Sequence, residues 1–277
     1  MSTRQLGNTS RSIITGAGSG FGRGLAIELA KRGGHLILSD INLTGLEETA
    51  SLVRSAGALS VTTLRCDVSL LADVEALATA AGDSPIDLVV NNAGISCGGL
   101  TGEIPIADWH KTIDIDLWGV IYGCHVFVPI LRRQGRGAIL NVASAAGLLS
   151  AGRMGPYNVA KAGVVSLSET LSAELAGTEI GVTVLCPSFF RTNIAVGGLF
   201  ADERSKRLAE KLVAKGRAVE EVVTAALHSV ERNELYCVPM ADARWFWRLK
   251  RALPGAFRTM LSTFDKFVYK KRQPNRP

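Results

Sequence analysis

Residues 12–22 read Ser-Ile-Ile-Thr-Gly-Ala-Gly-Ser-Gly-Phe-Gly, a short apolar run that leads into a glycine cluster and then a helical pattern. Gly16, Gly20 and Gly22 follow the spacing G-x-x-x-G-x-G. Glycines at such a turn let the backbone approach a pyrophosphate, which binds at the positive end of a helix dipole. The stretch therefore predicts a strand, a phosphate-binding loop and a helix, with Ser19 and Phe21 also beside the bound dinucleotide.

Strand-like apolar runs alternate with helical patterns up to about residue 240, which is typical of βαβ units. The fold class expected is α/β: a Rossmann-type, doubly wound, mainly parallel seven-stranded sheet with helices on both faces, in a single domain. The expected strands are Ser12–Thr15, His35–Ser39, Ser60–Leu64, Ile86–Asn91, Ala138–Val142, Val182–Cys186 and Leu235–Val238. The expected helices are Gly22–Arg32, Leu43–Ala56, Leu70–Ala80, Trp109–Arg133, Pro156–Ala176 and Val219–Arg232.

Two regions interrupt this alternation. Residues 188–212 show no strand pattern, and a loop of that length is expected to be a substrate lid over the 1–240 catalytic domain. Residues 241–277 form a basic, aromatic C-terminal extension with a net charge of +8, whereas the whole chain carries +6. The body of the protein is therefore nearly neutral, and the basic character belongs to the extension.

Composition excludes several other classes. The five cysteines are scattered without C-x-x-C spacing, which argues against a disulfide framework or a zinc site, and no metal is expected. The first residues lack the apolar core of a signal peptide. The most apolar stretch, Leu117–Leu131, is interrupted by glycine, histidine and proline, so no membrane span is expected. The expected location is the cytoplasm.

An acidic residue ends the second expected strand. Asp40 lies 24 residues after Gly16, close to the spacing at which a carboxylate binds the ribose hydroxyls of a dinucleotide. The same charge would repel the 2′-phosphate of NADP, and the sequence places no Arg or Lys beside Asp40 or at Ser19. The cofactor expected is therefore NAD, with NADP as the less favoured alternative.

Tyr157 and Lys161 lie four residues apart on an expected helix, so they share one face. An ammonium near a phenol favours the phenolate and should bring its pKa closer to neutral, as a general base requires. Ser144 comes thirteen residues before Tyr157, just after an expected strand, and its hydroxyl could bind a substrate oxygen. The alternative is an exposed pair on an amphipathic helix and a serine that merely forms a turn.

In these motifs the chain resembles the short-chain dehydrogenase/reductase family from about residue 10 to residue 240. The resemblance implies an NAD(P)-dependent oxidoreductase that moves hydride between nicotinamide and an alcohol/carbonyl pair. It implies Tyr157 as general acid/base, Ser144 as the polarising donor and Lys161 as a further contact to the nicotinamide ribose. The remaining cofactor-binding residues that it implies are Asp67, Val68, Asn91, Ala93, Gly94, Pro187 and Thr192.

Two positions depart from the family pattern. Asp116 stands where the family usually carries an asparagine that supports a water chain to the lysine, so its part in the catalytic group is in doubt. Its charge should tend to keep Lys161 protonated. Ser188 follows Pro187 where the family has glycine, which makes the start of the lid less permissive.

The substrate expected is a lipophilic secondary alcohol, ketone or aldehyde, because the candidate pocket edges carry few charges. These edges are Ile95, Leu148, Leu149, Met154, Phe189, Phe190, Ile194 and Phe200.

The family resemblance implies a homodimer or homotetramer, with Trp109–Arg133 and Pro156–Ala176 as the interface and close approach at Ala160, Ala162 and Gly163. The 241–277 extension suits contact with an anionic membrane surface, which would make the protein membrane-associated. Its interleaved basic and aromatic residues would also suit nucleic acid, although no nucleic-acid partner is expected. The simpler alternative is a helical extension that packs on its own domain or on a neighbouring subunit.

Two other functions remain open: an NADP-linked carbonyl reductase, and a catalytically weak dinucleotide-binding scaffold with a membrane-surface tail. Asp116 is the one sequence feature that favours the scaffold.

Overall fold

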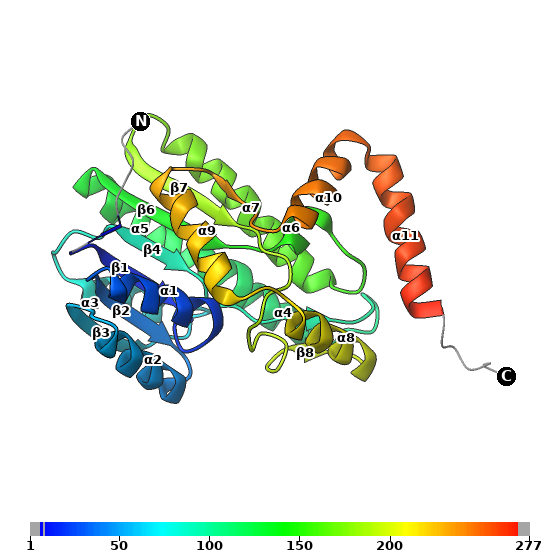
Figure 1. The fold of residues 1–277 in the computed structure, drawn as a ribbon, viewed down its shortest axis with the longest axis horizontal. Helices are drawn as coiled ribbons and strands as arrows, with labels where there is room; N and C mark the ends of the chain where they lie inside the picture. The colour runs from blue at the N-terminus through cyan, green and yellow to red at the C-terminus, as the bar shows by residue number, and fades with distance from the viewer. Residues whose placement is uncertain (1–5, 8, 271–277) are drawn as a thin grey trace.

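A twisted parallel sheet forms the centre of the protein. The computed structural model describes residues 6, 7 and 9–270 (Figure 1). Within them, seven strands pair in the order β3-β2-β1-β4-β6-β7-β9, and every pairing is parallel. The strands are β1 (Arg11–Thr15), β2 (His35–Asp40), β3 (Ser60–Arg65), β4 (Leu88–Asn91), β6 (Arg136–Val142), β7 (Glu179–Leu185) and β9 (Tyr236–Cys237).

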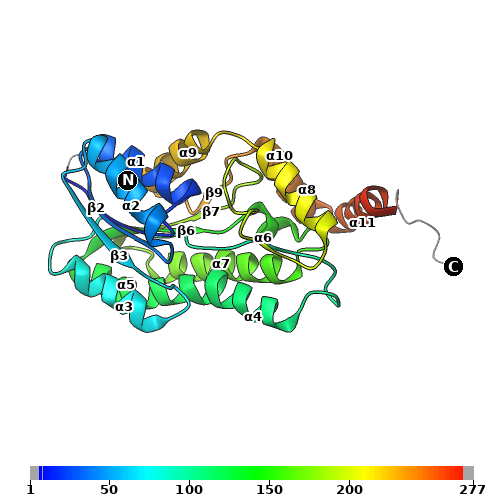
Figure 2. The same cartoon turned by 90° about the horizontal axis from the view of Figure 1, so that it is seen from below.

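Helices cover both faces of the sheet (Figure 2). One layer contains α1 (Gly20–Lys31), α2 (Leu43–Ser55) and α9 (Val219–Glu231), and the other contains α3 (Leu71–Ala81), α5 (Gly119–Gln134) and α7 (Gly155–Glu174). Strands buried on both faces read as continuous apolar runs, as Leu88-Val89-Val90 does in β4. This confirms the doubly wound α/β fold expected from the sequence.

The strand order fixes where a ligand can bind. The chain winds from β1 outward to β3 and then crosses back to β4 on the other side of β1, so the order reverses between β1 and β4. In such sheets the loops that leave the carboxyl ends of the strands diverge at the reversal and open a crevice. The loops after β1, β4, β6 and β7 all begin at this edge, and they carry the residues singled out in the sequence.

One helical segment, Ile106–Gln134, joins α4 (Ile106–Ile113) to α5 through a π-helical turn, η1 (Asp114–Trp118). Among the described residues it is the one helix long and apolar enough to cross a membrane, judged by length and composition only. In the structure it packs along β4, β6 and α7. A π turn adds a residue to the helical repeat and is often found at functional sites; here it turns Asp116 inward.

The expectation of a strandless 188–212 segment is wrong. Within it, β8 (Leu199–Phe200) pairs in parallel with β5 (Cys97–Gly98), and α8 (Glu203–Ala214) begins at the N-cap Asp202. The Asp202 carboxylate accepts hydrogen bonds from the backbone N–H and the hydroxyl of Ser205. A further short helix that the pattern missed, α6 (Ala145–Leu149), follows β6.

The C-terminal extension forms two helices, α10 (Ala241–Ala252) and α11 (Pro254–Lys270). Helix α10 packs on the catalytic domain: Trp247 stacks on Tyr236 with ring centroids 4.9 Å apart, and the Lys250 ammonium donates to the Leu148 carbonyl at 2.7 Å. Helix α11 packs on α10 and projects beyond the end of the domain that carries α8 (Figures 1 and 2). Residues 271–277 of the extension lie outside the described part of the chain.

The small residues expected to sit at an oligomer interface lie mostly within the subunit. Ala160 is completely buried, and a Cβ added at Gly163 would come within 2.8 Å of the Leu117 side chain of η1. The small size of Gly163 therefore serves the packing of α7 on η1. The apolar side chains that this layer does expose include Trp118 and Val159.

Candidate active site

The glycine-rich loop between β1 and α1 makes contacts that only a residue without a side chain allows. Gly16 and Gly20 have φ angles of +64° and +53°, which favour glycine. A Cβ at Gly16 would lie 2.7 Å from the Ala93 Cα, and one at Gly22 would overlap the Gly16 carbonyl. Gly16 and Gly20 line the large cavity, whereas Gly22 packs beneath the loop.

Hydrogen bonds from the loop after β4 hold the glycine-rich loop in place. The Asn92 side chain donates to the carbonyls of Thr15 and Gly16 at 2.8 and 3.0 Å, and the Thr15 hydroxyl accepts from the N–H groups of Asn92 and Ala93. Asn92 was not predicted as a site residue, although the pair Asn91-Asn92 is visible in the sequence. Strand β4 ends at Asn91, so the strand pattern gives no direction for the Asn92 side chain.

Asn91 lies in the core and not on the cavity wall. Its amide donates to Asn141 at 2.8 Å, and Asn141 in turn donates to the Ser168 hydroxyl at 3.0 Å. This buried chain ties β4 to β6 and α7. The family resemblance implies Asn91 as a cofactor-binding residue, but its side chain crosslinks the sheet and does not line the cavity.

Asp40 closes the crevice at the end of β2. One carboxylate oxygen accepts from the Gly18 N–H at 2.8 Å, and the other accepts from the Asn42 N–H at 2.8 Å. Both Asp40 and its neighbour Ile41 line the cavity. The strand register places Arg65 beside Asp40, but the Arg65 guanidinium is turned toward Asp73, 3.6 Å away.

The other expected cofactor contacts lie around the same crevice. Asp67 and Val68 line it after β3, and the Asp67 carboxylate accepts from the Ser69 N–H at 3.0 Å. Thr192 stands over Gly20, because a Cβ there would be 3.4 Å from the threonine side chain. Ala93, Gly94 and Pro187 also line the cavity, as do Ser19 and Phe21.

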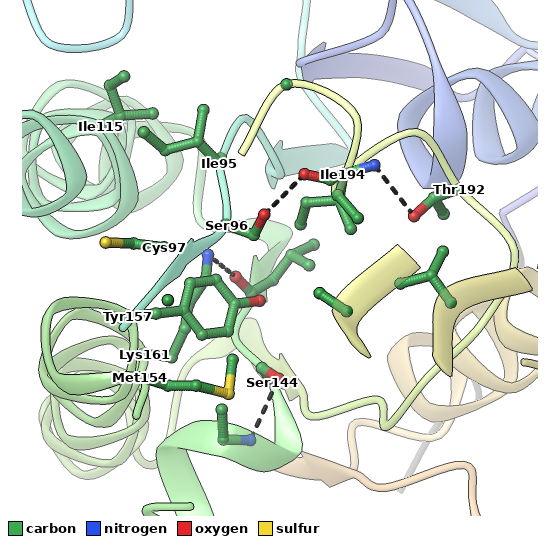
Figure 3. Close-up of a pocket in the computed structure, with 18 of the residues that line it drawn as sticks. Ile95, Ser96, Cys97, Ile115, Ser144, Met154, Tyr157, Lys161, Thr192 and Ile194 are labelled. Atoms are coloured by element: carbon green, nitrogen blue, oxygen red, sulfur yellow. Dashed lines mark hydrogen bonds between the residues drawn. The ribbon is translucent and has the colours of Figure 1, made fainter. Parts of the chain in front are cut away.

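The candidate catalytic side chains converge at the opposite side of this cavity (Figure 3). Helix α7 presents Tyr157 and Lys161 one turn apart, with the Lys161 ammonium 5.7 Å from the centre of the Tyr157 ring. The Tyr157 hydroxyl points into the cavity, where Ser144 enters from the end of β6 (Figure 3). The Ser144 hydroxyl accepts from the Ala146 N–H at 3.1 Å and donates to the Pro187 carbonyl at 3.4 Å.

Lys161 is fixed by two partners inside the protein. Its ammonium donates to the Val142 carbonyl at 3.1 Å and lies 3.2 Å from an Asp116 carboxylate oxygen. The second Asp116 oxygen accepts from the Ile95 N–H at 2.7 Å. Asp116 is completely buried and Lys161 is 3% exposed, so this is a buried ion pair. The amide on one oxygen and the ammonium near the other suit an ionised carboxylate.

Burial dominates the titration of Tyr157. It raises the pKa of the phenol because the phenolate is poorly solvated, while the Lys161 ammonium lowers it and the Asp116 charge raises it further. Lys161 therefore acts in the expected direction, but the net shift is opposite to the one expected from the sequence. The sequence could not show how deeply the ring is buried.

The pKa of Lys161 is raised. Burial alone would lower it, but the charge of Asp116 and then that of Tyr157 outweigh burial. This bears out the expectation that Asp116 keeps Lys161 protonated. Burial raises the pKa of Asp116 itself, against the lowering effect of Lys161 and of the Ile95 amide. The Cys186 thiol near this group stays neutral, because burial raises its pKa.

The cavity that joins these groups has a volume of about 1240 Å³, more than the roughly 300–1000 Å³ of a site for one drug-sized ligand. Of the expected pocket edges, Leu148 is buried away from it and the other seven line it. Charged wall residues beyond the glycine-rich end include Lys111 of α4 and Asp114 of η1. A further wall, which was not predicted from the sequence, is formed by residues of α8 and α11: Ser205, Leu208, Ala209, Leu212, Val213 and Leu261.

The crevice fits a nicotinamide dinucleotide. Gly16 and Gly20 present no side chain to the crevice at the N-terminus of α1, and the first turn of α1, which is fully described, contains no acidic residue. An anionic pyrophosphate suits that helix end. The Asp40 carboxylate lies at one end of the crevice, and Tyr157 and Lys161 lie at the other.

Comparison with known proteins agrees with this geometry. Residues 11–198 match the model of the short chain dehydrogenase family. An 11-beta-hydroxysteroid dehydrogenase A of Sesamum indicum is 33% identical over 247 residues, which are 86% of this chain and 70% of the relative.

Solved structures match over nearly the full length. A short-chain dehydrogenase/reductase of Burkholderia phymatum in complex with NAD superimposes with a TM-score of 0.84 at 34% identity, covering 99% of both chains. A short-chain dehydrogenase of Sphingobium yanoikuyae in complex with NADPH gives a TM-score of 0.74 at 28% identity, covering 97% of this chain and 98% of the other. The chain therefore belongs to the short-chain dehydrogenase/reductase family of oxidoreductases, which use nicotinamide cofactors and act on hydroxyl or carbonyl groups.

Proposed function

We propose that the protein is an NAD-preferring dehydrogenase that interconverts a lipophilic secondary alcohol and its ketone, with Tyr157 as the general acid/base. The observation that carries this proposal is the convergence of Ser144, Tyr157 and Lys161 on one end of a cavity whose other end is the glycine-rich loop. The alternative, a scaffold without turnover, is disfavoured because Asp116 leaves the geometry of the three groups intact.

In the oxidising direction, Ser144 and Tyr157 bind the substrate hydroxyl. The hydrogen bond from Ser144 to the Pro187 carbonyl is long, 3.4 Å, so its proton can turn to the substrate at little cost. Tyr157 as phenolate accepts the substrate proton, and the Lys161 ammonium stabilises the phenolate. A nicotinamide held between the glycine-rich loop and Lys161 would supply the hydride acceptor in this direction. The substrate proton ends on the Tyr157 oxygen, while Lys161 remains an ammonium held by Asp116 and the Val142 carbonyl.

The test is a turnover assay with purified protein. NAD and NADP are each offered with aliphatic, aromatic, steroid and retinoid alcohols, and formation of the reduced cofactor is followed by absorbance. We expect NAD-linked turnover that is fastest with lipophilic secondary alcohols. Cofactor binding without turnover of any alcohol or of the corresponding carbonyl compounds would favour the scaffold instead.

We propose NAD as the preferred cofactor on the strength of Asp40. Asp40→Asn should keep an oxygen for the Gly18 N–H but remove the charge that binds ribose hydroxyls and repels a 2′-phosphate. Hydrogen bonds to charged groups contribute about 1.5–3 kcal/mol, so the NAD/NADP ratio of kcat/KM should fall at least about tenfold. Kinetics with both cofactors measure this, and Asp83→Asn, which changes an exposed residue outside the cavity, is the control. An unchanged ratio would contradict the role of Asp40.

We also propose a homo-oligomer that uses the outer face of η1, α5 and α7. The support is the exposed Trp118 and Val159, of which Trp118 stacks on Tyr122 with ring centroids 5.5 Å apart. Apolar side chains that remain exposed in a group often mark an interface. Light scattering on Trp118→Glu measures the outcome: a smaller assembly is expected, with the fold retained.

A further inference from the structure

The cavity continues past the catalytic group into an apolar arm between α8 and α11. Its α8 wall consists of Ser205, Leu208, Ala209, Leu212 and Val213. Their spacing, i, i+3, i+4, i+7 and i+8, places them on one stripe of the helix. The charged residues Arg207, Lys211 and Lys215 are exposed instead. None of the α8 residues on the cavity wall is charged.

Helix α11 supplies the facing wall through Leu261. Phe257, one turn earlier on the same stripe, is 4% exposed and anchors the start of the helix. Leu261 is only half-buried, as are Leu208, Leu212 and Val213 across the arm. Helix α8 therefore presents an apolar stripe to a space that Leu261 of α11 also lines.

Binding of an apolar ligand to such an open apolar surface is favourable, because it removes apolar area from water. The arm is continuous with the site of Tyr157, because one cavity contains both. The occupant that this continuity favours is a part of the substrate itself, remote from the reacting carbon.

We infer that the α8–α11 arm binds the hydrocarbon body of an extended substrate, such as a long-chain secondary alcohol or ketone, and that Leu212 and Leu261 determine this specificity. The inference rests on the proposed function and deepens it by naming the shape of the substrate. A compact alcohol reaches Ser144 and Tyr157 without entering the arm. An extended alcohol buries its chain between the two helices.

The test uses a homologous series from 2-butanol to 2-dodecanol with the full-length protein and saturating NAD. Burial of one CH₂ corresponds to about a threefold to fourfold gain, so kcat/KM should rise by about that factor per carbon until the arm is filled. Leu261→Glu and Leu212→Glu should lower kcat/KM for 2-dodecanol at least tenfold, through KM, and leave 2-butanol within about twofold.

Matched controls place the same charge on the outer faces of the same helices. Ser262→Glu on α11 and Ala214→Glu on α8 change exposed residues and should leave the whole series unchanged. Thermal unfolding verifies that all four variants fold. If Leu261→Glu and Leu212→Glu both retain 2-dodecanol activity within about twofold, or if kcat/KM does not rise with chain length, the inference is wrong. Absence of turnover with every alcohol, short ones included, would instead count against the proposed function.

Discussion

Tyr157→Phe should lower kcat for alcohol oxidation by about 10²–10⁴-fold, the range typical of losing a general acid/base. The change removes only the phenol oxygen, which points into the cavity beside Ser144 (Figure 3). The ring packs with Cys97 and Ile104 in a small buried cluster, and phenylalanine can keep these contacts. The loss should therefore appear in turnover, while the Kd for NAD, measured by fluorescence titration, should stay within about threefold.

Tyr122→Phe is the control for this substitution. Tyr122 lies on the outer layer of α5, stacked on Trp118, and it is absent from the cavity wall. The control should be as active as the wild type. Turnover of Tyr157→Phe within tenfold of the wild type would remove Tyr157 from the proposed role, and a large loss of NAD affinity would show that the change had disturbed the crevice.

The order of strands and helices could be predicted because each βαβ unit has a local sequence pattern. The apolar run of β1, the glycine cluster and the amphipathic pattern of α1 together fix the direction of the chain, and the same alternation recurs through α9. The rules for parallel crossovers then leave few topologies. Tyr157 and Lys161 were equally accessible, because a spacing of four on a helix fixes a common face.

Helix α8 was missed although its sequence carried the signals. Asp202 is an N-cap residue, Glu203 follows in the first turn, and Leu208 and Leu212 recur at helical spacing. The apolar residues before Asp202 favour a lid, so the prediction placed the start of α8 within a loop. The strands β5 and β8, two residues each, offered no comparable pattern, because a pairing so short depends on tertiary contacts.

Burial and side-chain direction are the features that sequence reasoning could not supply. Asn91 and Asn92 are chemically identical, yet one crosslinks the sheet and the other supports the glycine-rich loop. The π turn that directs Asp116 toward Lys161 has no sequence signature. The pKa of Tyr157 depends on such details, because burial and the opposing charges of Lys161 and Asp116 together set the direction of its shift.

The second large effect concerns Asp116. Its charge raises the pKa of both Tyr157 and Lys161. Oxidation needs Tyr157 deprotonated and Lys161 protonated, so the pKa of Tyr157 sets the acidic limb of the pH profile and that of Lys161 sets the alkaline limb. Asp116→Asn removes the charge and keeps the shape, so both pKa values should fall. The whole active pH range should therefore move to lower pH, with kcat/KM at the optimum within about tenfold of the wild type.

Asp83→Asn is the control, because Asp83 is exposed just beyond the end of α3 and is absent from the cavity wall. It removes an equal charge and should leave the pH profile in place. An Asp116→Asn profile that is unchanged, or that moves to higher pH, would contradict the assignment.

The free energy of unfolding gives an independent test of the buried ion pair between Asp116 and Lys161. Asp116→Ala leaves the Ile95 N–H and the Lys161 ammonium buried without their partner, and breaking a buried ion pair on one side costs about 3–5 kcal/mol. Asp116→Asn should cost less, since its amide oxygen can still accept from the Ile95 N–H. Urea unfolding of the two variants and the wild type measures the difference. If both variants were as stable as the wild type, Asp116 and Lys161 would not be coupled as their 3.2 Å separation implies. The shift of the pH profile would then lose its physical basis, because the same charge that holds Lys161 in place sets the pH at which Tyr157 works.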